Sequence, residues 1–461
     1  MERLLAQLEE LLGRENVYRD QDAEAYKWDA LGSGRGFAGF DRLSPQPLAV
    51  VRPAGTEEVS AIVRLAGEHR VALVPFGGGS GLMGGAVAVR PSIVIDLARM
   101  DRVLAIDADD MTVTVQAGII LQELEEELAK HGVLLGHDPW TVAVATVGGA
   151  ISTNSLGYRG ARYGSMGDHV LGLTAVLPGG RILHTGGSPK ASVGPDLARL
   201  FIGGEGCFGI VTEATLRVFP QPETRSLRAY EFPLFERGFA AVVDIERRGL
   251  TASLLDYGEG YSGGRPEACR LYTGFEGLRD EVRAHDRLAR ETCLAAGGRE
   301  LPSDAAKEFW EHRHDIGNRY AERRRSGAPR ASPIGARFDF IHVALPASRV
   351  PAYHDACLEI IERHGLAPIE LGVWCRPQLF SAAMAEMRPA GAEGSGSLAA
   401  AVDEMLTLAQ DWGGSMEYCH GVGLRLTHLM KREHGAGLEV LRAIKRALDP
   451  HDIMNPGKLG L

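Results

Sequence analysis

Composition and charge describe an ordinary globular chain with one departure. The chain has 461 residues, of which 45% are apolar and 24% charged, and at ~150 residues per domain its length suggests about three folding units. The net charge of −10 gives no overall basic field, so nucleic acid is not an expected partner. Glycine is the departure, with 58 residues against an average share of ~7%. These glycines follow no three-residue period, which excludes collagen and indicates backbone that turns tightly or lies close to a ligand.

The cysteines and the apolar runs favour a cytoplasmic location. None of the six cysteines forms a CxxC pair, so the chain resembles neither a disulfide scaffold nor a zinc cluster, and a reducing compartment is expected. The opening residues MERLLAQLEELLGREN have helical spacing and do not resemble a signal peptide. No apolar run approaches the ~20 residues that a membrane span needs. We therefore expect a cytoplasmic protein without a membrane span.

The first part of the chain predicts a β-α-β unit that ends in a glycine-rich turn. Residues 48–74 read as a strand, an amphipathic helix capped by Thr56 and ending near His69, and a second strand. This strand leads directly into a turn at 75–85. Two further strands and a helix are expected after the turn, at 92–97, 111–118 and 120–132.

The character of the chain changes near residues 221–224. Before this point, a loop-rich tract ends in a hairpin turn at Pro178-Gly179-Gly180, and a glycine-rich turn at 203–209 leads into a strand. After it, strands and helices alternate as far as residue 411. The patterns predict one long helix over 296–325, a strand followed by a loop over 336–350, and a helix over 435–450.

The turn at 75–85 contains Gly79-Ser80-Gly81-Leu82-Met83-Gly84, which matches the GxGxxG pattern. In nicotinamide dinucleotide folds this pattern opens a helix whose N-terminus holds the pyrophosphate. Here Pro91 and a strand follow instead, which disfavours NAD. Successive backbone N–H groups of such a turn can still surround a polyanion. We therefore interpret the turn as a phosphate cradle, with an ordinary glycine-rich hairpin turn as the alternative.

Polar side chains accompany the later glycine-rich turns. Thr146, Ser152, Thr153, Asn154 and Glu205 lie in or beside these turns, where they could hydrogen-bond a polar heterocycle or a ribityl chain. The sequence contains no GxSxG motif, so it gives no indication of a serine hydrolase.

Four segments, taken together and in this order, carry a family resemblance. They are VRPAGTEEVSAIVRLAGEHRVALVPFGGGSGLMGGA, DPWTVAVATVGGAISTNSLGYRGARYGSMGDHVLGLTAVLPGGRIL, FIGGEGCFGIVTEATLRVFPQPE and ALDPHDIMNPGKLGL. They resemble the flavin-binding domain and the C-terminus of the vanillyl-alcohol oxidase / p-cresol methylhydroxylase superfamily. The resemblance implies an α+β fold with a two-subdomain FAD-binding domain at 1–222 and an inserted α+β substrate (cap) domain with a ferredoxin-like sheet at 223–411. A C-terminal segment at 412–461 would return to the FAD-binding domain.

The same resemblance implies FAD as the cofactor. The pyrophosphate would lie on residues 76–81, the isoalloxazine and ribityl near 138–146 and 148–154, and the adenine near Glu205. The residues implied to bind FAD are Pro75, Phe76, Gly77, Gly78, Gly79, Ser80, Gly81, Asp138, Pro139, Thr146, Gly148, Gly149, Ser152, Asn154, Glu205, Gly209, Ile210, Val211 and Asn455. Some relatives attach FAD covalently through a histidine in the first glycine loop, and this loop has none, so noncovalent FAD is expected. Attachment through His420 stays open.

Two branches of the family differ in their catalytic residues. Hydroxy-acid dehydrogenases often hold a metal with an HxGDGNxH strand and the glutamate of a GEHG motif. This chain has GVWCRPQLF without paired histidines and Tyr418-Cys419-His420-Gly421, so no metal is expected, although a Cys/His zinc site around Cys419 and His420 is an alternative. The branch of alkyldihydroxyacetonephosphate synthase has a histidine run and an active-site tyrosine here, and the chain keeps only His420.

Three residues are candidates for catalysis. His420 is the expected base, because a histidine with a pKa near neutrality suits removal of a hydroxyl proton, and its alternative role is a hydrogen bond to the flavin or the loop. Arg313 resembles the position at which hydroxy-acid relatives bind the substrate carboxylate, a task that suits a guanidinium. Arg376 is a second candidate for this task. Either arginine could instead be surface charge.

These observations favour an FAD-dependent oxidoreductase that oxidises a secondary alcohol, above all a 2-hydroxy acid, to the keto product by hydride transfer to flavin N5. A redox-neutral transferase, an aromatic alcohol oxidase and a flavoprotein subunit that only passes electrons are the alternatives. The expected partners are a small-molecule substrate and an electron acceptor, either oxygen or a carrier, and homodimerisation is open.

Overall fold

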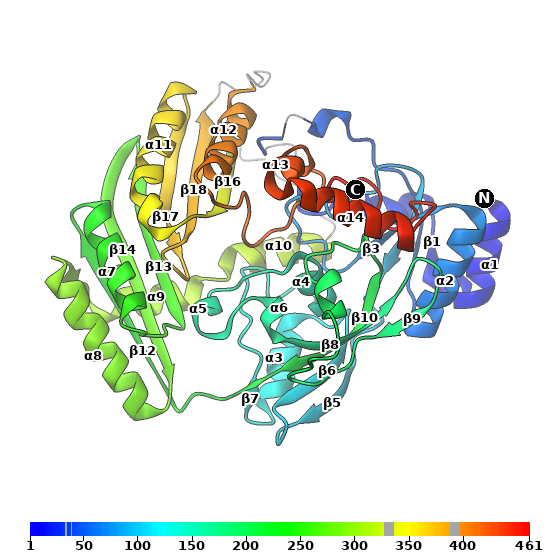
Figure 1. Cartoon of the computed structure of the whole chain (residues 1–461), viewed down its shortest axis with the longest axis horizontal. Helices are drawn as coiled ribbons and strands as arrows, with labels where there is room; N and C mark the ends of the chain where they lie inside the picture. The colour runs from blue at the N-terminus through cyan, green and yellow to red at the C-terminus, as the bar shows by residue number, and fades with distance from the viewer. Residues whose placement is uncertain (33–34, 38, 327–335, 388–395) are drawn as a thin grey trace.

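A computed structural model describes residues 1–32, 35–37, 39–326, 336–387 and 396–461. Within these residues, the N-terminal half carries two main sheets and a small two-stranded one, and the middle of the chain carries a third, larger main sheet (Figure 1). The mixture of helices and sheets confirms the predicted α+β class. No helix in the described ranges is long and apolar enough to cross a membrane.

The first sheet contains the predicted β-α-β unit. Its strand order is β1 (Val17–Tyr18), β2 (Pro47–Val51), β4 (Ser92–Asp96), β3 (Ala72–Phe76), with β2, β4 and β3 parallel. Helix α2 (Thr56–His69) connects β2 to β3 and buries Val59, Ile62 and Val63, while α1 (Glu2–Leu12) packs beside α2. The predicted cap is displaced by one residue, because Gly55 is the N-cap and Thr56 instead hydrogen-bonds Thr212 at 2.9 Å.

The second sheet is antiparallel. Its order is β5 (Val103–Asp107), β6 (Thr112–Gln116), β10 (Ile210–Arg217), β8 (Val170–Val176), β9 (Ile182–His184). The expected turn at Pro178-Gly179-Gly180 joins β8 to β9. A small sheet of β7 (Val133–Leu134) and β11 (Phe219–Pro220) and the helices α3 (Leu121–Ala129), α4 (Val147–Thr153), α5 (Gly160–Tyr163) and α6 (Met166–His169) complete this part.

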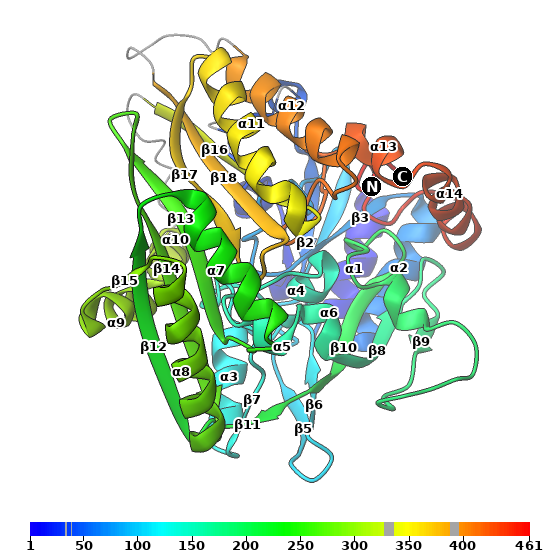
Figure 2. The same ribbon diagram turned by 60° about the vertical axis from the view of Figure 1, so that its left-hand side comes forward.

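The third sheet lies in the segment that was predicted to be the cap. Its antiparallel strand order is β15 (Arg299–Glu300), β12 (Thr224–Phe232), β14 (Arg265–Gly277), β13 (Leu254–Ser262), β17 (Ala367–Trp374), β18 (Leu379–Met387), β16 (Ala336–Ala344). Figure 2 shows one face of this sheet covered by α7 (Phe235–Arg247), α8 (Arg279–Ala295), α11 (Val350–Arg363) and α12 (Ser397–Asp411). Residues 303–312 also contact β12 and β14, where the Phe309 ring stacks on the Tyr272 ring at 4.1 Å.

The long helix predicted over 296–325 is wrong. Residues 303–326 form two helices, α9 (Ser303–His312) and α10 (Asp315–Ser326), which are separated at Arg313 and His314. Both residues at the break bind the Asp138 carboxylate, with Arg313 Nε at 3.0 Å and His314 Nε2 at 2.7 Å. The helix is thus interrupted by a tertiary contact that helical periodicity does not reveal.

The C-terminal segment lies against the first sheet. After α13 (Met430–His434) and α14 (Ala436–Leu448), the backbone pairs with β3: Leu73 N donates to Ile453 O at 2.7 Å and Asn455 N donates to Leu73 O at 2.8 Å. Arg425, at the start of this segment, also binds the buried Asp339 of β16. The segment therefore contacts both the cofactor side and the cap.

Glu276, on β14, ties the cap to the cofactor side. Its carboxylate is 1% exposed and binds Arg159 at 2.6 Å, from the segment before α5, and Arg225 at 2.7 Å, from β12. Burial raises the pKa of Glu276, but the charges of the two arginines more than offset this and hold the pKa below its ordinary value. Glu276 is thus ionised and carries the counter-charge for two guanidinium groups.

We expect Glu276→Gln to destabilise the protein by ~3–5 kcal/mol, because removing one partner of a buried pair leaves uncompensated charge. Unfolding in urea followed by tryptophan fluorescence measures this loss. Glu281→Gln is the matched control, since Glu281 pairs with Arg162 at 3.3 Å near the surface and its loss should cost no more than ~1 kcal/mol. Equal small losses in the two variants would contradict the role of Glu276.

Candidate active site

A cavity of about 370 Å³ lies between the cofactor loops, the cap sheet and the C-terminal segment. All of the predicted FAD-binding residues except Asp138 and Asn154 line it. The strands β13, β16, β17 and β18 contribute further residues, and the C-terminal segment contributes the predicted base. These further lining residues include Asp256, Tyr257, Phe340, His342, Glu370, Gly372, Val373, Trp374, Ser381, Ala382, Ala383, Cys419 and His420.

The first glycine loop lies so close to its neighbours that side chains do not fit. A Cβ atom on Gly78 would lie 1.8 Å from Val144 O, and one on Gly77 would lie 2.4 Å from Thr146 Oγ1. Gly79 has φ +63°, a left-handed conformation that favours glycine. The loop is followed by turns rather than by a helix, as the strand after Pro91 predicted. The residues of this loop line the cavity, where successive backbone N–H groups can surround a polyanion.

The first and third glycine-rich turns meet the C-terminal segment. Glu205 is buried, and its carboxylate accepts hydrogen bonds from Val422 N at 2.6 Å and Gly423 N at 3.0 Å. Burial raises the pKa of Glu205 to about 7, although these two hydrogen bonds act in the opposite direction. Asn455 donates to Glu205 O at 2.6 Å and to Gly85 O at 2.9 Å. One asparagine thus fixes both glycine-rich turns relative to each other.

Two predicted cofactor residues support the site without lining the cavity. Asn154 ends α4 in a left-handed conformation and accepts a hydrogen bond from Gly167 N at 2.9 Å. Asp138 is held by Arg313 and His314, whose hydrogen bonds and charges lower its pKa against the opposing effect of burial. The neighbouring Pro139 does line the cavity.

Neither predicted carboxylate-binding arginine lines the cavity. Arg313 binds Asp138 and lies over the Trp310 ring at 3.8 Å, and Arg376 is exposed in the turn between β17 and β18. Among the described residues, no lysine or arginine lines the cavity, whereas the carboxyl groups of Asp29, Glu205, Asp256 and Glu370 do. The two histidines, His342 and His420, are its only basic side chains within the same ranges.

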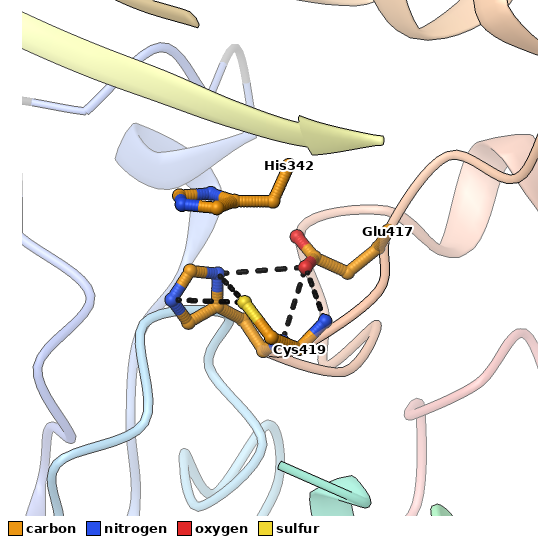
Figure 3. A group of neighbouring side chains, drawn as sticks. His342, Glu417 and Cys419 are labelled. Atoms are coloured by element: carbon orange, nitrogen blue, oxygen red, sulfur yellow. Dashed lines mark hydrogen bonds and ion pairs between the residues drawn. The ribbon is translucent and has the colours of Figure 1, made fainter. Parts of the chain in front are cut away.

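His420 belongs to a tight group of titratable side chains. Its Nδ1 lies 3.5 Å from Glu417 Oε1 and 3.4 Å from Cys419 Sγ, and its ring lies 4.6 Å from that of His342. Figure 3 shows His342 extending from its strand toward Glu417 and Cys419 on the C-terminal loop. Burial raises the pKa of Glu417, but His420 and backbone hydrogen bonds lower it to about 2. Glu417 is therefore a carboxylate next to the predicted base.

Three cavity residues were not found from the sequence. His342 lies on β16, far along the chain from His420, and no local pattern marks it. Asp256 on β13 and Glu370 on β17 also face the cavity, and burial and then the charge of Glu370 raise the pKa of Asp256 to about 8. The raised pKa favours the protonated form of Asp256, which can donate a hydrogen bond. Both carboxyls occur in strand patterns that give no sign of facing a ligand.

Comparisons with known families identify the chain. A family model described as an FAD binding domain matches residues 47–186, and a model of the C-terminal domain of FAD linked oxidases matches residues 221–459. The chain belongs to the FAD-linked oxidases. The cofactor of this FAD-linked oxidase is FAD, and the predicted family and enzyme class, an oxidoreductase, are confirmed.

Curated relatives of this FAD-linked oxidase match it along nearly its whole length. Glycolate oxidase subunit GlcD of Bacillus subtilis is 28% identical, over 94% of this chain and 93% of its own. D-lactate dehydrogenase of Archaeoglobus fulgidus is 30% identical, over 91% of this chain and 94% of its own. Alkyldihydroxyacetonephosphate synthase of Caenorhabditis elegans is 28% identical, over 90% of this chain and 76% of its own.

Solved structures share the fold of this FAD-linked oxidase at lower identity. A structure of p-cresol methylhydroxylase superposes with a TM-score of 0.80 at 18% identity, covering 100% of this chain and 96% of the other. One of alkyldihydroxyacetonephosphate synthase superposes with a TM-score of 0.79 at 21% identity, covering 99% and 85%. At these identities the likeness concerns the fold alone.

The residues of this FAD-linked oxidase fit FAD. The cradle at Gly77 and Gly78 has no room for side chains, as close approach of a polyanion to the backbone requires. Asn455 Oδ1 is buried and accepts no hydrogen bond from any described residue, so it is free to accept one from a ligand. The loop at 76–81, α4 and Asn455 would hold the cofactor.

Proposed function

We propose that this FAD-linked oxidase oxidises a secondary alcohol, specifically a 2-hydroxy acid, to the keto product with noncovalently bound FAD. The observation that carries the proposal is that His420 lines the same cavity as the FAD loops and lies beside a carboxylate, Glu417. Curated relatives named for glycolate, D-lactate and D-2-hydroxyglutarate support the substrate class. The glycine loop contains no histidine, which supports noncovalent binding.

His420 and Glu417 have different roles in the removal of the proton from the substrate hydroxyl. When FAD is bound, its N5 atom supplies the hydride acceptor. His420 accepts the proton of the substrate hydroxyl, so that the carbinol carbon loses a hydride, the oxygen loses a proton and the keto group forms. Glu417, 3.5 Å from the imidazole, stabilises the charge that His420 gains. Residues of the strands β13, β16, β17 and β18 line the cavity beside this site.

We expect the oxidised flavin absorbance to bleach when a 2-hydroxy acid is added without oxygen. The measurement is stopped-flow absorbance of the purified holoenzyme against both enantiomers of short and branched 2-hydroxy acids, with aromatic alcohols and sugar alcohols for comparison. If only aromatic alcohols reduce the flavin, the substrates are aromatic alcohols and the proposed class of 2-hydroxy acids is wrong. Absence of bleaching with every compound would favour redox-neutral alkyl transfer, since such turnover causes no net reduction. Reoxidation with oxygen or an artificial carrier then identifies the kind of acceptor.

A further inference from the structure

Helix α10, from the segment predicted to be the cap, contacts two of the loops that line the cavity. Gly317 packs so closely that a Cβ atom there would lie 1.8 Å from Trp140 O. One turn later, the Tyr320 hydroxyl donates a hydrogen bond to Gly79 O at 2.6 Å. Arg324 follows four residues further and reaches the same loop. These three helical residues lie at i, i+3 and i+7, so one face of α10 contacts both loops.

Arg324 lies against the first glycine loop. Its guanidinium carbon is 5.0 Å from the centre of the Phe76 ring, and a Cβ atom on Gly79 would lie 2.6 Å from the same carbon. Phe76 and Gly79 line the cavity and Arg324 does not, so the guanidinium lies on the outer side of the loop. Arg324 is half-buried, whereas its neighbours Arg323 and Arg325 are exposed. The loop therefore holds this one arginine of the three close to itself.

The charge of Arg324 is not balanced by a neighbouring carboxylate of the described residues. No ion pair or hydrogen bond joins its guanidinium to any of them, and its contact with Phe76 is a cation–π contact. An arginine side chain carries a full positive charge at neutral pH. Partial burial of an unpaired charge costs free energy, and an anion that approaches the charge offsets this cost. The surroundings of Arg324 therefore favour an anion at the first glycine loop.

The cavity itself offers little positive charge for such an anion. Of the described residues, no lysine or arginine lines it, whereas four carboxyl groups do. FAD carries a diphosphate, to which backbone N–H groups supply only partial charges. At an effective dielectric constant of ~20, a unit charge ~8 Å away changes the affinity for a singly charged anion by ~30-fold. A guanidinium just outside the cavity wall can therefore contribute to the binding of the cofactor.

We propose that helix α10 is part of the FAD site: Arg324 supplies positive charge to the diphosphate from the outer side of the first glycine loop, and Tyr320 orients the loop. A planar trans peptide directs its C=O and N–H groups to opposite sides. Because Tyr320 binds Gly79 O on the side of α10, the N–H of Ser80 points to the other side, and Ser80 lines the cavity. Arg324 and Tyr320 are thus positioning residues for the cofactor.

The role of α10 does not depend on the substrate or on the reaction. It rests on one part of the proposed function, the noncovalent binding of FAD, with the diphosphate at the first glycine loop. Acid precipitation of the holoenzyme tests noncovalent binding separately, because covalently attached flavin stays with the precipitate. Flavin in the precipitate would refute noncovalent binding, whereas flavin in the supernatant is the expected result.

The test of Arg324 is FAD binding by the apoprotein of the full chain. Fluorescence titration at low ionic strength gives the dissociation constant of FAD for the wild type and for Arg324→Met. Methionine keeps an apolar side chain against Phe76 and removes the charge. We expect Arg324→Met to bind FAD at least ~10-fold more weakly. Riboflavin, which lacks the diphosphate, should bind both proteins with the same affinity.

Neighbouring residues of α10 provide matched controls. Arg323→Met and Arg325→Met remove the same charge from the same helix, but both side chains are exposed, so each should bind FAD within about twofold of the wild type. Arg324→Lys retains the charge and should restore most of the affinity. Tyr320→Phe removes only the hydroxyl that binds Gly79 O and should weaken FAD binding by ~2–10-fold.

Two kinds of result would overturn the role of Arg324. One is an FAD affinity of Arg324→Met equal to those of the two control variants. The other is an effect of shape rather than charge, seen as an Arg324→Lys protein as weak as Arg324→Met or as equal losses for FAD and riboflavin. If circular dichroism shows that Arg324→Met does not fold, Arg324→Gln takes its place. A flavin that no 2-hydroxy acid reduces would refute the proposed reaction and leave these affinities unchanged.

Discussion

Gly78→Ala should yield a folded protein that has lost most of its affinity for FAD. The added Cβ would lie 1.8 Å from Val144 O, and both groups are backbone-bound, so no flexible side chain can make room. The loop must move away from Val144 and hence toward the cofactor. Overpacking of this kind costs ~1–3 kcal/mol or more, which corresponds to ~5–150-fold in the dissociation constant of FAD if the cost falls on the bound state. Flavin content after purification and fluorescence titration of the apoprotein measure the loss.

Gly55→Ala is the control for this variant. Gly55 precedes α2 in the same half of the molecule, and a Cβ atom there would meet no heavy atom within 4 Å. It should bind FAD like the wild type. If Gly78→Ala kept full flavin content and an affinity within about twofold of Gly55→Ala, the first glycine loop would not be the pyrophosphate cradle.

The second large effect is expected at His420. His420→Ala should slow anaerobic flavin reduction by ~10²–10⁴-fold, because a positioned general base contributes about this factor. FAD binding should change little, since the FAD loops do not depend on this side chain. Stopped-flow absorbance at saturating substrate measures the rate of reduction separately from reoxidation.

His428→Ala serves as the comparison. His428 belongs to the same segment, but its side chain is 48% exposed and pairs with Asp403 at the surface. It should reduce its flavin at the wild-type rate. A His420→Ala protein that matched it would show that His420 only hydrogen-bonds the cofactor or the loop, and Asp256 or His342 would then have to be tested as the proton acceptor.

The residues around the cofactor could be predicted from the sequence because they lie in short continuous segments. The turn at 77–85, the residues around Thr146 and Gly148, and the turn at 203–209 are short continuous stretches in which glycine itself marks close approach. Amphipathic periodicity likewise predicted α2 and α14, whose buried faces follow the helical repeat. Only details that depend on single contacts, such as the cap at Gly55, were missed.

The residues around the substrate were harder to predict from the sequence because they come from strands that are far apart in the chain. His342 and Asp256 are brought to the cavity by pairings within a seven-stranded sheet whose order does not follow the sequence. The break between α9 and α10 depends on Asp138, and the same contact draws Arg313 away from the cavity. The helical pattern around an arginine does not indicate which carboxylate its side chain will contact. Sequence periodicity therefore found the elements but not their mutual contacts.

The pairing of Leu73 with Ile453 and Asn455 has a consequence for biosynthesis. A ribosome delivers the first cofactor loop long before it delivers Asn455, the residue that joins Gly85 to Glu205. Contacts between such distant parts of a chain form late and slowly. The nascent chain must therefore keep an unfinished sheet edge and an exposed glycine loop until residue 455 has emerged. The contacts of Asn455 with both glycine-rich turns are complete only once that residue has emerged, and the waiting intermediate is the form most exposed to aggregation.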